Sequence, residues 1–221
     1  MRSFDTSPFV VPPQQERSRA ALARIIQAAA EVMVARGLEG FSMAEIAAAA
    51  GMPVGNIYRR FKGKDDIIQA IKLDATARLE AAVMQKLDGQ DFSEARDLVF
   101  AYAQSMAAAF EKDEALHKVL FNQPTINPTL SKIGTEGRLR IYDQYKKSLL
   151  PLLGDVPNRR KEVLVRVSFQ IITLAFLAKA AGNDQLMSGT SWTAAAREYG
   201  EAAFRYLASH GDGDDSLSDP R

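Results

Sequence analysis

The stretch GMPVGNIYRRFKGKDD, residues 51–66, places a tyrosine and two arginines between two isolated apolar residues, Ile57 and Phe61. Proline is tolerated only in the first turn of a helix, so Pro53 predicts a short helix over 53–62, and Gly63 ends it. Ile57 and Phe61 are four residues apart and therefore lie on one side of this helix. That side is the predicted contact with the rest of the protein.

The opposite side of the predicted helix is polar and cationic. It carries Gly55, Asn56 and Arg59, flanked by Tyr58, Arg60 and Lys62. Arginine matches guanine edges in the major groove and asparagine matches adenine edges, while tyrosine and lysine bind phosphates. The pattern therefore indicates a helix that contacts double-stranded DNA.

A solvated surface helix is the alternative interpretation, because surface helices are often rich in arginine. Such a helix gains stability from Glu–Arg pairs at four-residue spacing, yet no acid occurs between Pro53 and Lys64. A glycine such as Gly55 also costs a short helix about 1 kcal/mol. Lys64 precedes a predicted helix start, where the macrodipole disfavours a cation unless an anion lies nearby. These costs favour the nucleic-acid interpretation.

Two further helices are predicted before this stretch. Apolar residues from Leu22 to Met33 recur at helical spacing, which predicts a helix over 17–36. A second, short helix begins after Ser42, which has the spacing of a capping box with Glu45. Helices of two turns are unstable alone in water, so the three helices are expected to form one cluster.

Beyond residue 64 the sequence predicts longer helices and no strands. They are expected over about 65–87, 93–111, 113–122, 128–150, 157–182 and 191–209. The expected fold class is therefore all-α. Its expected parts are a flexible arm over 1–16, a helix-turn-helix unit over 17–64, a larger helical part over 65–210 and a disordered acidic tail over 211–221.

Composition argues against several other classes. The 221 residues contain no cysteine, so disulfides and thiolate metal sites are excluded. The two histidines, His117 and His210, lie in no nucleophile or ligand pattern, so no catalytic site, metal or cofactor is expected. Residues 1–64 carry nine Lys or Arg against five Asp or Glu, whereas the rest carries nineteen against twenty-two. The positive end suits an anionic partner.

The longest apolar segment, VLVRVSFQIITLAFLAKAAG over 163–182, is interrupted by Arg166, Ser168, Gln170 and Thr173. Since a bilayer requires about 20 predominantly apolar residues, a buried helix is expected rather than a membrane span. The first residues lack the apolar core of a signal peptide. The chain is therefore expected to be soluble and cytoplasmic.

Residues 17–68 resemble the DNA-binding region of the tetracycline-repressor (TetR) family of bacterial transcriptional regulators. The matching features are AAAEVMVARGLEGFSMAEIAAAAG over 28–51, followed by Gly55, Ile57, Tyr58, Phe61, Lys64 and the acid pair at 65–66. Beyond residue 70 the resemblance rests on length and helical character. It implies an all-helical homodimer that binds a near-palindromic operator and represses transcription until a small-molecule effector binds the larger domain.

The resemblance also assigns roles. Ser42, Tyr58 and Lys64 match phosphate contacts, and the resemblance puts four positions against bases. The full predicted DNA-binding set is Ser42, Val54, Gly55, Asn56, Tyr58, Arg59, Arg60, Lys62 and Lys64, with the bases facing Val54, Gly55, Asn56 and Arg59, and with Arg60 suited to either purpose. Pro53 stands where the family commonly has a Ser or Thr cap, so the start of that helix is expected to be less well satisfied and one hydroxyl contact to be missing. Ala44 stands where some members place a base-reading basic residue. The second helix is therefore expected to read little sequence, and Ser42 also has the role of a plain N-cap.

The larger helical part is expected to dimerise and to bind the effector. Helices over 157–182 and 191–209 are the predicted dimer surface, with central core as the alternative. An apolar effector cavity is predicted from Phe100, Met106, Phe110, Phe121, Phe169, Gln170 and Thr173, again with core packing as the alternative. A two-fold dimer suits DNA because half-sites lie about 34 Å apart or a multiple of it.

Two other functions fit the same sequence. One is a helical small-molecule binder or enzyme in which the N-terminal unit is only structural. Equal DNA affinity in the wild type and an Arg59/Arg60 double alanine variant would favour it. The other is a regulator that activates transcription rather than represses it.

Overall fold

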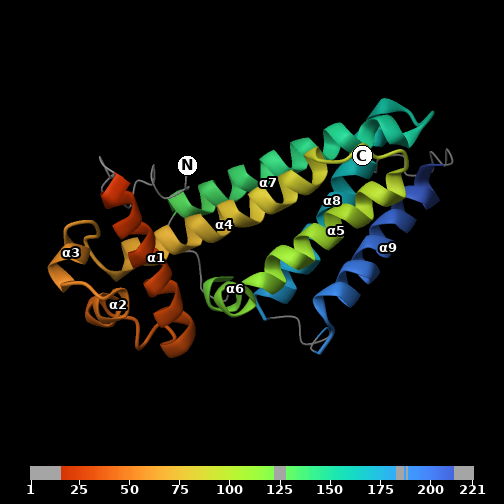
Figure 1. The fold of residues 1–221 in the computed structure, drawn as a ribbon. Helices are drawn as coiled ribbons and strands as arrows, with labels where there is room; N and C mark the ends of the chain where they lie inside the picture. The colour runs from red at the N-terminus through yellow and green to blue at the C-terminus, as the bar shows by residue number, and fades with distance from the viewer. Residues whose placement is uncertain (1–15, 122–127, 183–186, 188, 212–221) are drawn as a thin grey trace. The chain divides into compact units, whose positions relative to one another are not determined.

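Helices account for the regular structure of this chain. The computed structural model describes residues 16–121, 128–182, 187 and 189–211, and over these residues it contains ten helical elements and no strand (Figure 1). The predicted all-α class is therefore confirmed. The predicted arm up to residue 15 and the predicted tail from residue 212 lie outside the described residues.

Residue contacts divide the chain into two compact units. Unit 1 comprises Met1–Arg78 and Asp113–Thr135, and unit 2 comprises Leu79–Lys112 and Glu136–Arg221. The long helix α4 (Lys64–Asp88) contributes to both. The predicted boundary at residue 64 divides the chain by function rather than by packing, and it stays a prediction.

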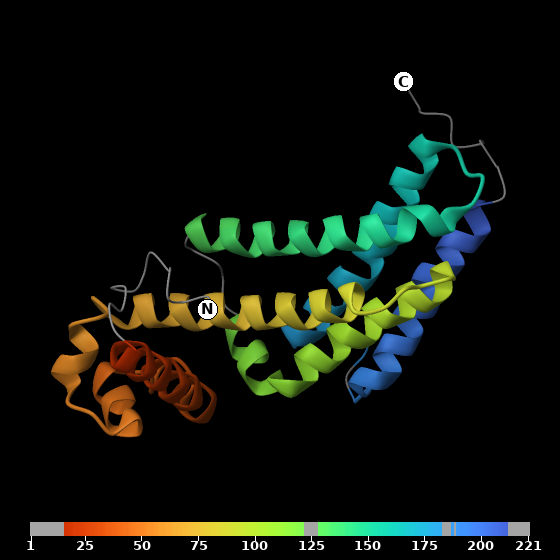
Figure 2. The same cartoon turned by 45° about the horizontal axis from the view of Figure 1, so that its top comes forward.

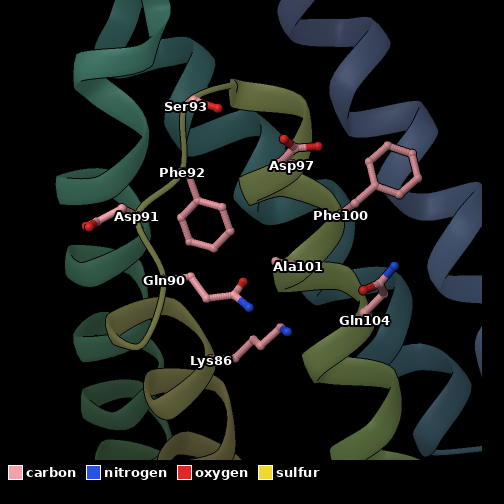
Figure 3. A pocket seen from close by; sticks show the side chains of 9 residues that line it. All are labelled: Lys86, Gln90, Asp91, Phe92, Ser93, Asp97, Phe100, Ala101 and Gln104. Atoms are coloured by element: carbon pink, nitrogen blue, oxygen red, sulfur yellow. The ribbon is translucent and has the colours of Figure 1, made fainter.

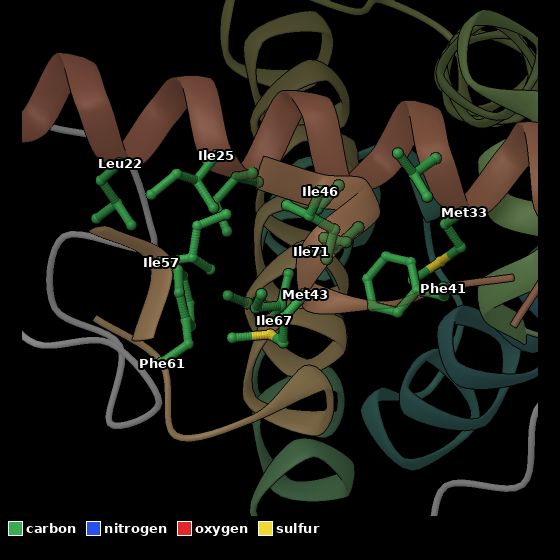
Figure 4. Close-up of a cluster of buried hydrophobic side chains, with 14 of the residues drawn as sticks. Leu22, Ile25, Met33, Phe41, Met43, Ile46, Ile57, Phe61, Ile67 and Ile71 are labelled. Atoms are coloured by element: carbon green, nitrogen blue, oxygen red, sulfur yellow. The ribbon is translucent and has the colours of Figure 1, made fainter. Parts of the chain in front are cut away.

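Unit 1 is built around one apolar core. Its helices are α1 (Glu16–Arg36), α2 (Met43–Ala50), α3 (Val54–Tyr58), the first part of α4, and α6 (Glu114–Phe121). Ile46 of α2 and Ile57 of α3 are both 0% exposed in this core, which Figure 4 shows in close-up. Leu116 and Leu120 bring α6 into the same core. The short helices α2 and α3 therefore depend on packing for their stability, as expected.

The start of α2 is fixed by the predicted cap. The Glu45 N–H donates to Ser42 Oγ at 3.2 Å, and the Ile46 N–H donates to Ser42 O at 3.0 Å. The Glu45 carboxylate lies 3.4 Å from the Arg36 guanidinium, so it pairs there instead of closing the predicted capping box. Gly51 ends the helix in the left-handed region, at φ 59°.

Unit 2 packs long helices against one another. Its elements are the end of α4, α5 (Ala95–Lys112), α7 (Pro128–Leu149) from residue 136, the 3-10 helix η2 (Leu150–Leu153), α8 (Asn158–Ala180) and α9 (Trp192–Gly211). Figure 2 shows α5, α8 and α9 side by side, in agreement with their contacts. Gly200 of α9 faces α5, since a Cβ added there would lie 3.4 Å from Phe100 Cδ1.

The apolar helix α8 is two-sided. Among the described residues it is the helix long and apolar enough to cross a bilayer, a property that core helices of soluble proteins share. Leu164, Ile172 and Phe176 on one side are fully buried. Arg166 and Gln170 on the other side are exposed. The buried side agrees with the expected core helix. Of the four polar interruptions, Arg166 and Gln170 are exposed, whereas Ser168 and Thr173 are buried.

Candidate nucleic-acid interface

The predicted recognition helix is shorter than the sequence indicated. α3 spans Val54–Tyr58, whereas the prediction was 53–62. Pro53 is the N-cap rather than a first-turn residue, and it makes no side-chain hydrogen bond to the helix end. Arg59 is the C-cap. The weakly capped start expected from proline at this position is therefore present.

The chain turns after α3 because two backbone N–H groups donate to the same carbonyl oxygen. The Arg60 and Phe61 N–H groups donate to Ile57 O at 2.9 and 3.0 Å. The Lys62 N–H donates to Asp66 Oδ2 at 2.9 Å, which ties the turn to the start of α4. Phe61 remains over the core at 1% exposure, so the predicted buried side is correct. Arg60 and Lys62 lie in the turn instead of on the predicted helix.

The outward side of α3 includes three of the four predicted base-facing positions and Tyr58, a predicted phosphate contact. Val54 is 42% exposed and Tyr58 55% exposed, and Gly55 and Arg59 are exposed beside them. A Cβ added at Gly55 would meet no atom within 4 Å, so this position opens onto free space. Asn56 is half-buried. The helix therefore presents a narrow outward side with little side-chain bulk near its start.

Three cations extend this surface. Arg59, Lys62 and Lys64 are exposed, and within the described part of the chain none of their side chains pairs with an acid. Lys64 is the first residue of α4, where the helix macrodipole disfavours a positive charge. Ser42 is exposed at the start of α2. The surface thus carries positive charge and a hydroxyl, which are the groups that bind DNA phosphates.

Arg60 differs from its neighbours because it has an internal partner. Its Nη2 donates to Ser18 Oγ at 2.7 Å, which joins the turn after α3 to the first turn of α1. Burial, and secondarily the charge of Arg59, lowers the pKa of the Arg60 guanidinium. Sequence reasoning missed Ser18, since the two residues are 42 positions apart and no spacing pattern connects them.

The buried histidine of unit 1 belongs to its core. His117 of α6 is 2% exposed, and its ring stacks on Phe121 with centroids 5.6 Å apart. The described residues contain no group of three or more side chains that could hold a metal ion. The surroundings of His117 are those of a structural residue, the more frequent role for a lone histidine on a helix.

The predicted effector residues are divided between the two units. Phe121 lies in unit 1, whereas the other six lie in unit 2. Met106 and Phe110 are 2% and 0% exposed in the core of unit 2. Gln170 is exposed on α8, but Thr173 is buried. Core packing, the alternative interpretation of this apolar pattern, therefore describes Met106 and Phe110.

Phe169 and Thr173 belong to a packed aromatic cluster. The Tyr102 hydroxyl lies 2.7 Å from Thr173 Oγ1, and the Tyr145 hydroxyl lies 3.1 Å from Ser168 Oγ. The Tyr102 ring stacks on Phe169 with centroids 5.3 Å apart. Burial raises the pKa of both tyrosines well above their ordinary range. Phe169 and Thr173 are thus packed against buried tyrosines of neighbouring helices.

An open hollow lies instead beside the loop between α4 and α5. Its volume is about 540 Å³, and its lining is Lys86, Gln90, Asp91, Phe92, Ser93, Asp97, Phe100, Ala101 and Gln104. Figure 3 shows Lys86, Gln90 and Phe92 reaching toward α5. Phe100 is the predicted effector residue that it includes. Ligand pockets commonly measure about 300–1,000 Å³, so the hollow is large enough for a small molecule.

Comparisons with known proteins agree with the fold and with the resemblance of the N-terminal region. Residues 25–71 match the model of the tetR family of bacterial regulatory proteins. A tetR-family regulatory protein from Rhodococcus is 22% identical with a TM-score of 0.65, and the match covers 85% of this chain and 96% of that one. A protein from Mesorhizobium loti, assigned to the tetR-family transcriptional regulators, is 19% identical with a TM-score of 0.69 over 88% and 98%. No curated protein matches the chain in sequence.

Residues 25–71 therefore match the tetR family, and the described part of the chain has the fold of solved tetR-family regulators. The resemblance stated from the sequence is confirmed. The matched segment runs from α1 into α4 and includes every residue of the predicted DNA-binding set.

Proposed function

We propose that this regulator acts in the cytoplasm as a dimeric repressor that binds a two-fold symmetric operator and is released by a small-molecule effector. The outward side of α3 is the observation that carries the DNA-binding part. Ile57 and Phe61 anchor this segment in the core at 0% and 1% exposure. Arg59 faces solvent with no acid partner among the described residues. A helix selected for stability alone would pair such a cation.

The chemistry of α3 suits the major groove. A guanidinium at Arg59 can bind guanine O6 and N7 with two parallel hydrogen bonds, and Val54 can contact a thymine methyl group. Gly55 lets the helix approach the bases closely because its position opens onto free space. The exposed Ser42 and Tyr58 hydroxyls and the Lys64 ammonium are placed to bind phosphates on either side.

A salt-dependent titration tests the DNA-binding proposal. Duplexes are enriched from a random pool with the wild-type protein, and fluorescence anisotropy then compares them with scrambled duplexes between about 50 and 200 mM salt. We expect preferential binding to the enriched duplexes and a steep loss of affinity with salt. Equal affinity for scrambled duplexes, or affinity independent of salt, would contradict the proposal.

The exposed side of α8 supports the dimer. Every fourth residue from Glu162 to Ala178 is exposed, and the stripe includes Leu174, a large apolar residue that is 54% exposed. The half-buried Ile171 lies beside it. Such a stripe gains stability by covering itself with the same stripe of a second copy. Leu174→Arg should therefore give a monomer by sedimentation with weaker operator binding, whereas an unchanged dimer would place the interface elsewhere.

The hollow beside α5 is the proposed effector site. Lys86 lies at one end and Asp97 at the other, with the Phe92 ring between them (Figure 3). This arrangement suits a molecule with an apolar body and polar ends. An effector must bind the DNA-incompetent form more tightly, because equal affinity for both forms shifts nothing. Compounds that raise the melting temperature of the wild type should do so less for Phe92→Ala, and equal shifts would exclude this site.

A further inference from the structure

Among the described residues, neither Arg60 nor Ser18 donates a side-chain hydrogen bond beyond the one that joins them. The guanidinium is the donor and Ser18 Oγ the acceptor, at 2.7 Å. A hydroxyl that accepts one hydrogen bond keeps its own hydrogen available, and a guanidinium has five N–H donors in a planar fork. Within the described part of the chain no acid pairs with Arg60. Two adjacent groups, from α1 and from the turn after α3, can therefore donate to one further acceptor.

We propose that Ser18 and Arg60 together form a phosphodiester-binding site, in which one DNA phosphate accepts hydrogen bonds from both side chains. The site joins the first turn of α1 to the turn that follows the recognition helix. It rests on the proposed DNA-binding function. It also gives α1 a direct contact with the DNA, through a residue outside the predicted DNA-binding set.

The charge around Arg60 favours an external anion. Arg59 is its neighbour in sequence and lowers the pKa of its guanidinium, after burial, which is the larger cause. Both effects act on a cation that lacks a nearby counter-charge. Asp66, an acid close in sequence, already accepts the Lys62 N–H at 2.9 Å. A phosphate would supply the missing negative charge through charge-assisted hydrogen bonds.

Ser18 also separates the roles of the two adjacent arginines. Its hydroxyl holds the Arg60 guanidinium against α1, whereas Arg59 has no partner within the described residues and is exposed at the end of α3. A side chain that is ordered before binding loses less conformational freedom when it binds. Arg60 is thus prepared for one fixed phosphate, and Arg59 remains free to reach a base edge.

A double-mutant cycle tests this site on the enriched duplex. Affinities and salt slopes are measured for wild type, Ser18→Ala, Arg60→Met and the double variant, with Arg197→Met as the matched control. Arg197 is an exposed arginine of unit 2 that pairs with Glu198 at 2.8 Å. Arg60→Met should lose at least about tenfold in affinity and lower the salt slope by about 1. Its preference among duplexes should not change.

Ser18→Ala, alone and combined with the Arg60 variants, gives a second test of the shared site. Ser18→Ala should lose less affinity and keep the salt slope, because it removes no charge. The loss of affinity in the double variant should be smaller than the sum of the two single losses, since both side chains act on one phosphate. Arg60→Lys keeps the charge but lacks the fork, so it should retain the salt slope and reduce the loss caused by Ser18→Ala.

The outcomes separate this site from the function on which it rests. Independent losses in the double variant, or an unchanged salt slope in Arg60→Met, would overturn the shared site. An altered duplex preference would assign Arg60 to base reading instead. If Arg60→Met does not fold, the site is overturned when Ser18→Ala costs as much in Arg60→Lys as in wild type. Failure of the wild type to bind any duplex would overturn the proposed function as well.

Discussion

Arg96 in unit 2 and Arg59 at the end of α3 are both exposed arginines, yet their surroundings differ. The Arg96 guanidinium lies over the rings of Phe100 and Phe204, at 4.7 and 5.0 Å from their centroids. It also donates to Glu201 at 3.2 Å. Arg59 has no such partner among the described residues. Arg96 joins α5 to α9, whereas Arg59 is left available for a partner outside the chain.

Two other cations of unit 2, like Arg96, pair with an acid. Arg140 of α7 makes two hydrogen bonds to Glu80 of α4, at 2.5 and 2.8 Å, and these raise the pKa of its guanidinium. Lys146 lies 2.7 Å from Glu162. Single surface pairs stabilise a fold only slightly. These paired cations of unit 2 contrast with Arg59, Lys62 and Lys64 around α3, none of which pairs with an acid among the described residues.

The largest expected effect tests the unpaired arginine. Arg59→Ala should weaken binding to the enriched duplex by about 1–3 kcal/mol, because it removes contacts with a base edge. It should leave thermal unfolding nearly unchanged, since the side chain is exposed. Arg197→Ala removes the same charge from unit 2 and should leave the affinity unchanged. Equal losses in both variants would show a general charge effect and would erase the contrast.

The next effect concerns the buried hydroxyls of unit 2. Burial raises the pKa of Tyr102 and Tyr145 above their ordinary value of 10.0. Above pH 10 the unfolded chain therefore loses these protons while the folded chain keeps them. The resulting stabilisation is complete below pH 10 and is lost as the pH rises, by up to about 1.4 kcal/mol per pH unit for each tyrosine.

Urea unfolding between pH 9 and pH 11 measures this loss, with Tyr102→Phe for comparison. The variant should lose stability less steeply with pH than the wild type, because one titrating group is absent. Parallel curves for the two proteins would show that Tyr102 ionises equally easily in the folded state, contrary to its burial.

A smaller effect is expected for the paired arginine. Arg96→Ala should lower the free energy of unfolding by about 1 kcal/mol, because it removes stacking on two rings and an exposed ion pair. Its affinity for DNA should not change when the protein is folded. The measurement is thermal or urea unfolding beside the anisotropy titration. A DNA defect in a stably folded Arg96→Ala protein would contradict the assignment of this arginine to the fold.

The smallest effect is expected for Gly55→Ala, which should raise stability and lower DNA affinity. Gly55→Ala should raise the free energy of unfolding by less than about 1 kcal/mol, because alanine favours a helix and the new Cβ meets no protein atom within 4 Å. The same methyl group should reduce DNA affinity if α3 lies close to the bases. Thermal unfolding and anisotropy on one preparation separate the two effects. Improved stability with unchanged affinity would place Gly55 away from the DNA.

The sequence predicted most of the helices because their signals are local. Ser42 and Gly51 mark the ends of α2 in both the sequence and the structure. The spacing of Ile57 and Phe61 correctly predicted the buried side, although the helix ends between them. A turn and a helix both bring residues four apart to the same side, so spacing alone could not find that end.

Long-range features were beyond the same reasoning. The core position of Leu116 in unit 1 depends on contacts between α6 and α1, which no periodicity records. The Ser18–Arg60 hydrogen bond likewise joins distant segments. The stacking of Phe169 on Tyr102 was also beyond sequence reasoning, because apolar residues at helical spacing fill a core as readily as they line a pocket.

Selection of bound duplexes, read base by base, is the most direct test of whether Arg59 contacts a DNA base. Wild type and Arg59→Ala are each used to enrich duplexes from the same random pool, and the enriched sequences are aligned. Our account predicts a two-fold symmetric motif for the wild type, and the same motif with one guanine position per half-site relaxed for the variant. Identical motifs from the two proteins, or no motif from the wild type, would contradict the claim that the unpaired side of α3 reads DNA.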